Sequence, residues 1–555
     1  MFPRLARLLM LACGIALACP AAQADDCHGD RDFCATASRY AMLLRLPGYA
    51  VAVARNGKLV HWQSGGYADT ARQTPIRPDS IFPVASITKT FTAAMMMQYV
   101  EEGRIRLDDA IADYPQVDNA AAWPWSSPDI RIRHVLSQTS EGAKPGTVFS
   151  YNGNRYNAVY GVFAKLAGEK DYARAFADRI GLADTSPGWP DDAADPRIAR
   201  IVTPYRYDRE RKTYIADDDL TTGHRHAYPN SGMLSTANDL ARYADALDRG
   251  LLVGKAGDAA MTTPFTLNDG TASPYALGWF SERWNGRRLA WVYGLGPSYS
   301  SFLLRVPGER LCLIFLANTD APTASLRLNY GGALQFPLAA PFLRRYAKDG
   351  KALPELPLDA DAGALEARIA RLPPERRVAA FTMATGIAAT WNYVEKKGEV
   401  SPGNAAALIA ALQRIDPGWF RALHPELAGT MADIAAPGLL APMNELAAAY
   451  SATGRIDPRI SQDFADYYDR TSQDESAARQ RAALVAAPGY DTNDATILAR
   501  FALGDRSFRA GDVAAGREHY WKGIRDAVLA GWSPRFADRK REQMNALTRE
   551  HAATP

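Results

Sequence analysis

A serine and a lysine, Ser86 and Lys89, lie three residues apart at the start of the apolar stretch 83–100. Good helix formers fill this stretch and Gly103 follows it, so the pattern predicts a helix whose first turn carries both side chains on one face. A hydroxyl beside an ammonium group near the positive end of a helix favours alkoxide formation, and the free N–H groups there can hold an oxyanion. The pair therefore predicts nucleophilic catalysis, although Ser-x-x-Lys alone also occurs by chance.

The size and charge of the chain limit what else it can be. Its 555 residues predict two or three domains, because single hydrophobic cores stop growing at roughly 250–300 residues. The formal net charge is only +3, which gives no reason to expect a nucleic-acid or anionic membrane partner. Its eight histidines are scattered, and the nearest pair, His224 and His226, lacks an acidic or cysteine partner at ligand spacing. We therefore expect no metal and no cofactor.

The first 24 residues have the pattern of a secretory signal peptide. Arg4 and Arg7 precede the apolar run 8–19, and Ala-Gln-Ala at 22–24 fits a cleavage site. We expect the mature chain to be exported to a periplasm. Cleavage before Cys19 with lipid attachment is the weaker alternative, and no later apolar run is long enough to span a bilayer.

Three cysteines follow this expected leader. Cys27 and Cys34 are close enough in sequence to form a small disulfide in an oxidising compartment. Cys312 lies in the strand-like run 310–316, where a buried and unreactive thiol is expected.

Strand-like segments occur at both ends of the first 348 residues, with helical patterns between them. The alternating segments 49–53 and 59–62 around Asn56-Gly57 predict a β-hairpin. Further strands are predicted at 277–280, 288–293, 299–306 and 310–316. We expect an α+β fold: one antiparallel sheet built from both ends, flanked by helices and interrupted by a helical insertion.

The composition changes after about residue 350. A proline-containing linker at 353–357 precedes a region rich in alanine, arginine and leucine with few strand-like runs. Residues 507–521 predict a helical hairpin, without the 34-residue period of a repeat array. The predicted organisation is a leader at 1–24, a first domain at 26–348 and an all-helical domain of unknown role at 358–555.

The first domain resembles the serine β-lactamase and penicillin-binding protein superfamily, on the branch of class C β-lactamases, D-aminopeptidases and related esterases. The resemblance covers residues 48–345 and rests on the order and separation of five motifs. These motifs are Phe82-Pro83-Val84-Ala85-Ser86-Ile87-Thr88-Lys89, residues 132–140, residues 145–151, residues 232–240, and Pro307-Gly308-Glu309 with residues 316–318. The resemblance implies a β-lactamase/transpeptidase-like fold with a C-terminal helical extension.

The same resemblance implies roles for individual residues. Ser86 is the nucleophile that forms an acyl-enzyme, and Lys89 keeps the site electropositive and assists proton transfer. Tyr151 is the base toward Ser86 and the acid toward the leaving group. An ordinary tyrosine has a pKa of about 10, so we expect Lys89 to lower the pKa of Tyr151. The N–H groups of Ser86 and Leu295 are expected to form the oxyanion hole.

The family's Tyr-x-Asn element corresponds here to Tyr151-Asn152-Gly153, which departs from the family pattern. Its third position, where relatives carry a substrate-binding asparagine, is Gly153. Asn152 or Asn154 could reach into the site instead.

The strand motif, Lys-Thr-Gly or His-x-Gly in relatives, departs as well. Aligning its glycine to Gly296 places Pro297 at the oxyanion position, where proline has no N–H to donate. We prefer alignment to Gly294, so that the motif reads Val292-Tyr293-Gly294 and lacks the cation that grips a β-lactam or D-alanine carboxylate. Arg287 or Arg288 could replace that cation.

These features predict a hydrolase of esters or amides, of the esterase or D-amino-acid peptidase type, rather than a typical β-lactamase. Asn152, Gly153, Tyr293 and Gly294 are the predicted substrate-binding residues. The alternative is a catalytically degenerate penicillin-binding-like protein that binds cell-wall peptide or a partner through its helical domain.

Overall fold

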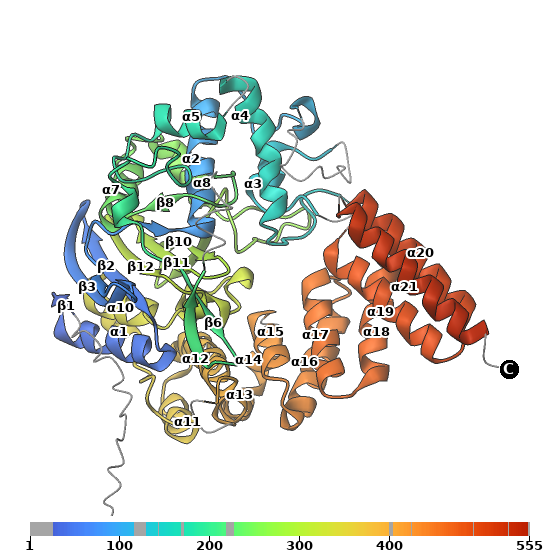
Figure 1. Ribbon diagram of the computed structural model, residues 1–555. Helices are drawn as coiled ribbons and strands as arrows, with labels where there is room; N and C mark the ends of the chain where they lie inside the picture. Colours follow the sequence, from blue (N-terminus) through green and yellow to red (C-terminus); the bar gives the residue numbers. More distant parts are fainter. Residues whose placement is uncertain are drawn as a thin grey trace, which may run out of the picture.

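An antiparallel sheet forms the centre of the first half of the chain (Figure 1). The computed structural model describes residues 26–115, 129–141, 144–167, 171–217, 227–398, 403–422, 425–491, 493–530 and 532–552. The strand order is β1-β3-β2-β12-β11-β10-β9, and β4 pairs with β3. The strands are β1 Asp26–His28, β2 Gly48–Arg55, β3 Lys58–Asp69, β4 Thr74–Pro75, β9 Phe280–Trp284, β10 Arg287–Leu295, β11 Ser300–Val306 and β12 Leu311–Ala317. Early and late strands meet at the β2–β12 pair, which confirms the predicted sheet.

The central strands are buried on both faces. Val51 of β2 lies opposite Phe315 of β12, and both belong to one hydrophobic cluster. The adjacent pair, Ala52 and Ile314, belongs to a second cluster on the other face. Because side chains alternate along a strand, this near-continuous run of apolar residues supplies two cores at once.

Helices cover both faces of the sheet. One face packs on α1 Arg31–Leu44 and α10 Ala339–Tyr346. The opposite face packs on α2 Thr88–Glu101, which directly follows Ser86, and on α7 Ala237–Arg249. The remaining helices of this part are α3 Ile132–Leu136, α4 Tyr160–Ala167, α5 Asp171–Arg179, α8 Lys255–Thr262 and α9 Ala321–Ala324. This arrangement confirms the predicted α+β architecture, with helices inserted between the two groups of strands.

One boundary differs from the prediction. The strand expected at 277–280 begins only at Phe280, because Gly278 adopts a φ of +85° that interrupts the extended backbone. At the start of the chain, Asp26–His28 pair with β3, and α1 begins only at Arg31, where Asp30 caps the helix.

The described residues after 361 form helices joined by turns and loops, as predicted, and Figure 1 shows them in yellow, orange and red. The helices are α11 Ala362–Ala370, α12 Pro374–Glu395, α13 Asn404–Ile415, α14 Pro417–Arg421, α15 Pro425–Ile434, α16 Leu440–Ala452, α17 Pro458–Arg470, α18 Asp474–Ala486, α19 Asp494–Arg509, α20 Val513–Leu529 and α21 Pro534–Ala552. Helices α19 and α20 pack against each other as the predicted hairpin.

The hydrophobic core crosses the predicted domain boundary at 348–358. Phe381 of α12 and Phe464 of α17 belong to the same cluster as Phe315 of the sheet. A methyl group on Gly386 would lie 2.0 Å from the carbonyl oxygen of Gln335, so α12 is in direct backbone contact with the first part of the chain. Helices α19 to α21 have a core of their own. The division into two domains stays a prediction, and the first helices after residue 361 share a hydrophobic core with one face of the sheet.

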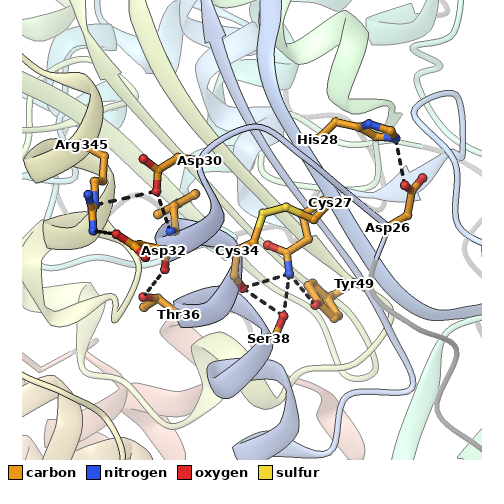
Figure 2. The surroundings of a disulfide bond; sticks show 12 residues. Asp26, Cys27, His28, Asp30, Asp32, Cys34, Thr36, Ser38, Tyr49 and Arg345 are labelled. Carbon is orange, nitrogen blue, oxygen red and sulfur yellow. Dashed lines mark hydrogen bonds and ion pairs between the residues drawn. A yellow bond between two sulfur atoms is a disulfide. The ribbon is translucent and has the colours of Figure 1, made fainter.

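A disulfide joins Cys27 in β1 to Cys34 in α1, which confirms the predicted pairing (Figure 2). Arg345 of α10 forms ion pairs with Asp30 and Asp32 at the start of α1, so this edge of the fold is held by covalent and ionic links. Cys312 is buried in β12, and burial raises its pKa to about 12. The expected leader at 1–24 lies outside the described residues.

Candidate active site

Ser86 lies on a sharp turn between a short strand and α2. Strand β5 (Phe82–Pro83) pairs with β8 (Leu234–Ser235), and η1 (Ala85–Ile87) leads directly into α2. Ala85 adopts a φ of +45°, in the left-handed region that a non-glycine residue rarely occupies. Such backbone strain typically costs on the order of 1–3 kcal/mol and persists where the surroundings impose it. The surrounding structure therefore fixes the position of Ser86 on this turn.

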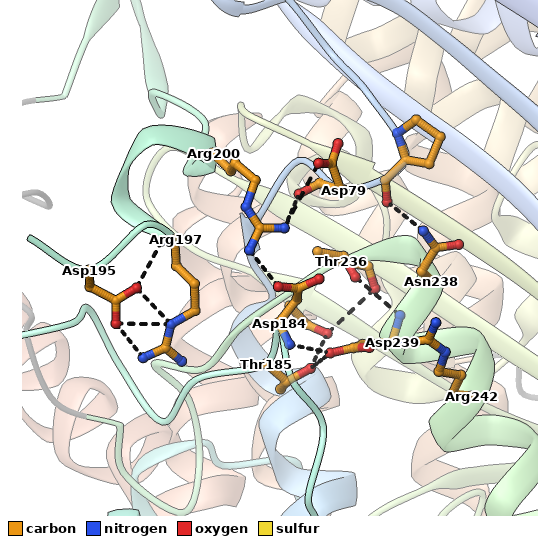
Figure 3. A network of polar contacts seen from close by, with 12 residues as sticks. Asp79, Asp184, Thr185, Asp195, Arg197, Arg200, Thr236, Asn238, Asp239 and Arg242 are labelled. Carbon is orange, nitrogen blue, oxygen red and sulfur yellow. Dashed lines mark hydrogen bonds and ion pairs between the residues drawn. The ribbon is translucent and has the colours of Figure 1, made fainter.

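A buried aspartate fixes the strand that supports this turn (Figure 3). Asp239, in the first turn of α7, accepts hydrogen bonds from the Asp184 N–H at 2.8 Å and the Thr185 hydroxyl at 3.0 Å. The Thr185 hydroxyl oxygen also lies within hydrogen-bonding distance, at 2.9 Å, of the hydroxyl oxygen of Ser235 in β8. Thr236 caps α7 by accepting from the Asp239 N–H. The hydrogen bonds around Asp239 thus hold β8 in place, and β8 in turn holds β5, the strand before Ser86.

Lys89 is the direct partner of the nucleophile. Its Nζ donates to Ser86 Oγ at 2.8 Å and to the carbonyl oxygen of Asn230 at 2.9 Å. The side chain is buried, and burial lowers the pKa of Lys89 to about 7. A lysine with this pKa is substantially neutral at physiological pH and can accept the Ser86 proton.

Tyr151 lies near both Ser86 and Lys89, with its ring centroid 5.3 Å from Lys89 Nζ. Burial raises the pKa of Tyr151 to about 12, and the Ser86 hydroxyl and the charge of Arg459 only partly oppose this effect. The expectation that Lys89 would lower this pKa is wrong, because desolvation outweighs the neighbouring charges. The Tyr151 hydroxyl is close enough to Ser86 for the serine to affect its pKa. It nevertheless forms no hydrogen bond of good geometry among the described residues. Tyr151 therefore stays protonated at neutral pH and suits proton donation.

Strand β10 passes close to the nucleophile turn. A methyl group on Gly294 would lie 2.5 Å from the Val84 carbonyl oxygen and 2.2 Å from Ser301 Oγ. Ser301 Oγ also donates to the Val84 carbonyl at 2.8 Å. Only glycine allows this approach, so Gly294 serves the packing of β10 against the Ser86 turn.

Leu295 and Tyr293 flank that glycine. Leu295 ends β10 and is 45% exposed, whereas Tyr293 is buried with its ring centroid 5.6 Å from that of Tyr151. The Ser86 N–H lies in the first turn of a helix, where backbone donors lack intrahelical partners. An oxyanion hole formed by Ser86 and Leu295 stays a prediction.

The side chain of Asn152 serves the backbone around it. Its Nδ2 donates to Glu141 at 2.9 Å, and its Oδ1 accepts from the N–H groups of Asn154 at 3.1 Å and Arg155 at 3.3 Å. These bonds form the turn into η3 (Asn154–Val159) and leave one amide hydrogen for a ligand. The sequence did not indicate this structural use.

Gly153 leaves a space beside the catalytic amine. A methyl group on this residue would lie 3.7 Å from Lys89 Nζ and 4.0 Å from Asn230 Nδ2. Asn230 therefore directs a side-chain amide toward the space that the missing asparagine would fill. Sequence reasoning missed Asn230, which lies in Pro229-Asn230-Ser231-Gly232, immediately before the motif 232–240.

The helical region contributes a cation to this neighbourhood. Arg459 of α17 donates from Nε to Ser150 Oγ at 3.2 Å, across 309 residues of sequence. No motif pointed to it. Arg287 and Arg288 are used elsewhere: Arg287 pairs with Glu309 and Asp349, and Arg288 donates to the hydroxyls of two threonines near α8.

In the described ranges, no group of three or more His, Cys, Asp or Glu side chains could hold a metal ion, and His224 and His226 lie outside those ranges. No helix in the same part of the chain is long and apolar enough to cross a membrane.

Comparison with known proteins identifies the first part of the chain. Residues 38–335 match the family model described as Beta-lactamase. Penicillin-binding protein 4* of Bacillus subtilis is 23% identical over 320 residues, covering 49% of this chain and 68% of that protein. A D-aminopeptidase of Brucella canis is 26% identical over 337 residues, covering 55% of this chain and 62% of that protein. A class C β-lactamase structure from Rhodobacter sphaeroides shows 20% identity and a TM-score of 0.42, over 53% of this chain and 95% of that one. The helical region after residue 335 lies outside the family match.

Proposed function

The chain belongs to the beta-lactamase family of serine hydrolases, and on that premise we propose that it hydrolyses an ester or amide through an acyl-enzyme on Ser86. One observation carries the proposal: Lys89 Nζ lies 2.8 Å from Ser86 Oγ, and its pKa is lowered to about 7. A serine hydroxyl needs a nearby base to become a nucleophile at neutral pH, and a neutral buried lysine is such a base.

In this mechanism neutral Lys89 takes the proton from Ser86 Oγ as that oxygen attacks the substrate carbonyl carbon. The negative charge that develops on the carbonyl oxygen faces the N–H groups of Ser86 and Leu295. Tyr151 gives its phenolic proton to the leaving amine or alcohol and regains a proton from Lys89. Water then attacks the acyl carbon and gives a proton to neutral Lys89. The bond from that carbon to Ser86 Oγ breaks as Lys89 returns the proton to Oγ, which releases the carboxylic acid and restores the free enzyme.

The substrate class follows from what lines the site. The three residues of the motif Val292-Tyr293-Gly294 include no cation, which argues against a typical β-lactam substrate. The named activity of the D-aminopeptidase relatives supports an amide of a D-amino acid, and an ester remains within the same chemistry. Gly153 and Tyr293 would border the acyl group.

We place the enzyme outside the cytoplasm, in a periplasm. The disulfide between Cys27 and Cys34 supports this location, because cytosolic thiols are normally kept reduced.

Labelling with a fluorophosphonate probe, followed by intact-mass measurement, tests the proposal. We expect one adduct on the full-length protein, its loss in Ser86→Ala and its retention in the control Ser451→Ala on α16. The same mass measurement with D-amino-acid amides, short esters and β-lactams would identify the acyl donor. An unlabelled wild-type protein that binds peptides without turnover would instead establish the degenerate alternative.

A further inference from the structure

We propose that Arg459, supplied by the helical region, binds a carboxylate of the substrate that acylates Ser86. The inference deepens the proposed function and rests on it. It makes α17 part of the active site and defines the substrate class as an ester or amide that bears a carboxylate close to the scissile bond.

The first observation is where Arg459 lies. Its Nε donates to Ser150 Oγ at 3.2 Å, and Ser150 immediately precedes Tyr151. Its positive charge lowers the otherwise raised pKa values of both Tyr151 and Tyr293. Those two rings lie 5.6 Å apart and form one wall beside the nucleophile. The guanidinium of a residue distant in sequence therefore lies beside this wall, next to the residue that precedes Tyr151.

The second observation is that the guanidinium has donors to spare. Arginine carries five N–H donors, and in the described part of the chain Arg459 makes the bond from Nε and no ion pair. The residue is half-buried, and no hydrogen bond from either terminal nitrogen is found among the described residues. A planar fork with free terminal nitrogens matches a carboxylate, which it binds through two parallel hydrogen bonds.

Other arginines between the helical region and the sheet show the contrast. Arg327 binds Asp433 through two bonds, at 2.7 and 2.8 Å, and also pairs with Asp463. Arg455, four residues before Arg459, pairs with Asp269. These arginines form ion pairs with carboxylates of the protein itself. Arg459 forms none in the described part of the chain, although its charge also lowers the otherwise raised pKa values of Asp457 and Asp494.

The helix that carries Arg459 is firmly anchored. Asp457 caps α17 and accepts from the Arg459 N–H at 2.9 Å, which fixes the backbone at this residue. One turn later, Asp463 accepts from the Tyr330 hydroxyl at 2.6 Å and pairs with Arg327, both in the first part of the chain. The cation is thus positioned before substrate arrives, which reduces the entropy lost on binding.

Two matched esters test the assignment, 3-carboxyphenyl acetate and 3-carbamoylphenyl acetate, which differ in one substituent: an anionic carboxylate in the first and a neutral carboxamide of similar shape in the second. On the full-length enzyme we expect Arg459→Gln to lower kcat/KM for the carboxyphenyl ester about 10- to 100-fold and to change the carbamoyl ester less than about threefold. Arg459→Lys should recover part of the loss, because a charge remains without the planar fork. Arg455→Gln is the matched control and should leave the ratio between the two esters unchanged.

An equal loss for both esters in Arg459→Gln, with no recovery in Arg459→Lys, would assign Arg459 a purely structural role and overturn the inference. An unchanged ratio would overturn it as well. In either case normal fluorophosphonate labelling of Ser86 would leave the proposed function standing. A wild-type enzyme that neither labels nor turns over either ester would remove both.

Discussion

The Lys89 amine lies 2.8 Å from the Ser86 hydroxyl oxygen, in an environment that lowers the lysine pKa to about 7. The neutral amine is the form that accepts the serine proton, so activity should follow its deprotonation. We expect kcat/KM for a neutral ester to rise about tenfold per pH unit below 7 and to level off above it. A profile measured from pH 5 to 9 checks this expectation. Lys89→Arg, which cannot deprotonate, should lose at least about 100-fold at every pH, and a flat wild-type profile would contradict the role of Lys89.

Tyr151 offers a test that separates catalysis from packing. Its hydroxyl is buried without a hydrogen bond of good geometry, so removing it should cost little stability. We expect Tyr151→Phe to keep the wild-type Tm within about 2 °C and to lower kcat about 10²- to 10⁴-fold. Tyr275→Phe is a close control, because that hydroxyl is also buried and unpaired and its ring lies 5.8 Å from Tyr151. Equal activity in both variants would show that Tyr151 only packs.

Two glycines of the site should respond oppositely to the same substitution. Gly294→Ala forces a methyl group to 2.2 Å from Ser301 Oγ and 2.5 Å from the Val84 carbonyl, so we expect a loss of about 1–3 kcal/mol in unfolding free energy. Gly153 has helical φ and ψ angles of −57° and −44°, and its nearest contact would be at 3.7 Å. Gly153→Ala should therefore gain about 0.4–1 kcal/mol. Urea unfolding measures both, and a stable Gly294→Ala protein would refute the close approach of β10.

The disulfide predicts a stability effect that spares catalysis. Cys27 and Cys34 are separated by 7 residues, and a loop of this size is expected to contribute about 2 kcal/mol by restricting the unfolded chain. The double substitution of both cysteines by serine should lower the Tm by several degrees without reducing turnover at 25 °C. Dithiothreitol should lower the wild-type Tm in the same way. A Tm that is insensitive to reductant would show that the bond is absent or contributes nothing.

Local patterns were enough to predict the sheet and the close approach of Ser86 and Lys89. The alternation of apolar and polar residues on both sides of Asn56-Gly57 predicts a hairpin, because strand periodicity and turn chemistry act over a few residues. The spacing of Ser86 and Lys89 places them on one helical face, and the structure brings them within hydrogen-bonding distance. The cysteine pair was predictable for the same reason: its members are neighbours in the chain.

Burial and long-range packing could not be predicted in this way. The pKa of Tyr151 depends on the rings of Tyr275, Phe280 and Tyr293, which come from distant segments and remove water from its hydroxyl. The role of Asn152 depended on where Glu141 lies.

The sequence by itself determined the family and predicted the reaction class, since the Ser86-Ile87-Thr88-Lys89 spacing and the order of the five motifs can be read without any knowledge of tertiary contacts. The tertiary structure alone decided what surrounds that chemistry. It brought Asn230 to the space beside Gly153 and Arg459 to Ser150, over 309 residues in the second case. The physical reason is that helix and strand patterns act between residues close in sequence. A substrate site is assembled by the packing of a shared hydrophobic core, which no local pattern encodes.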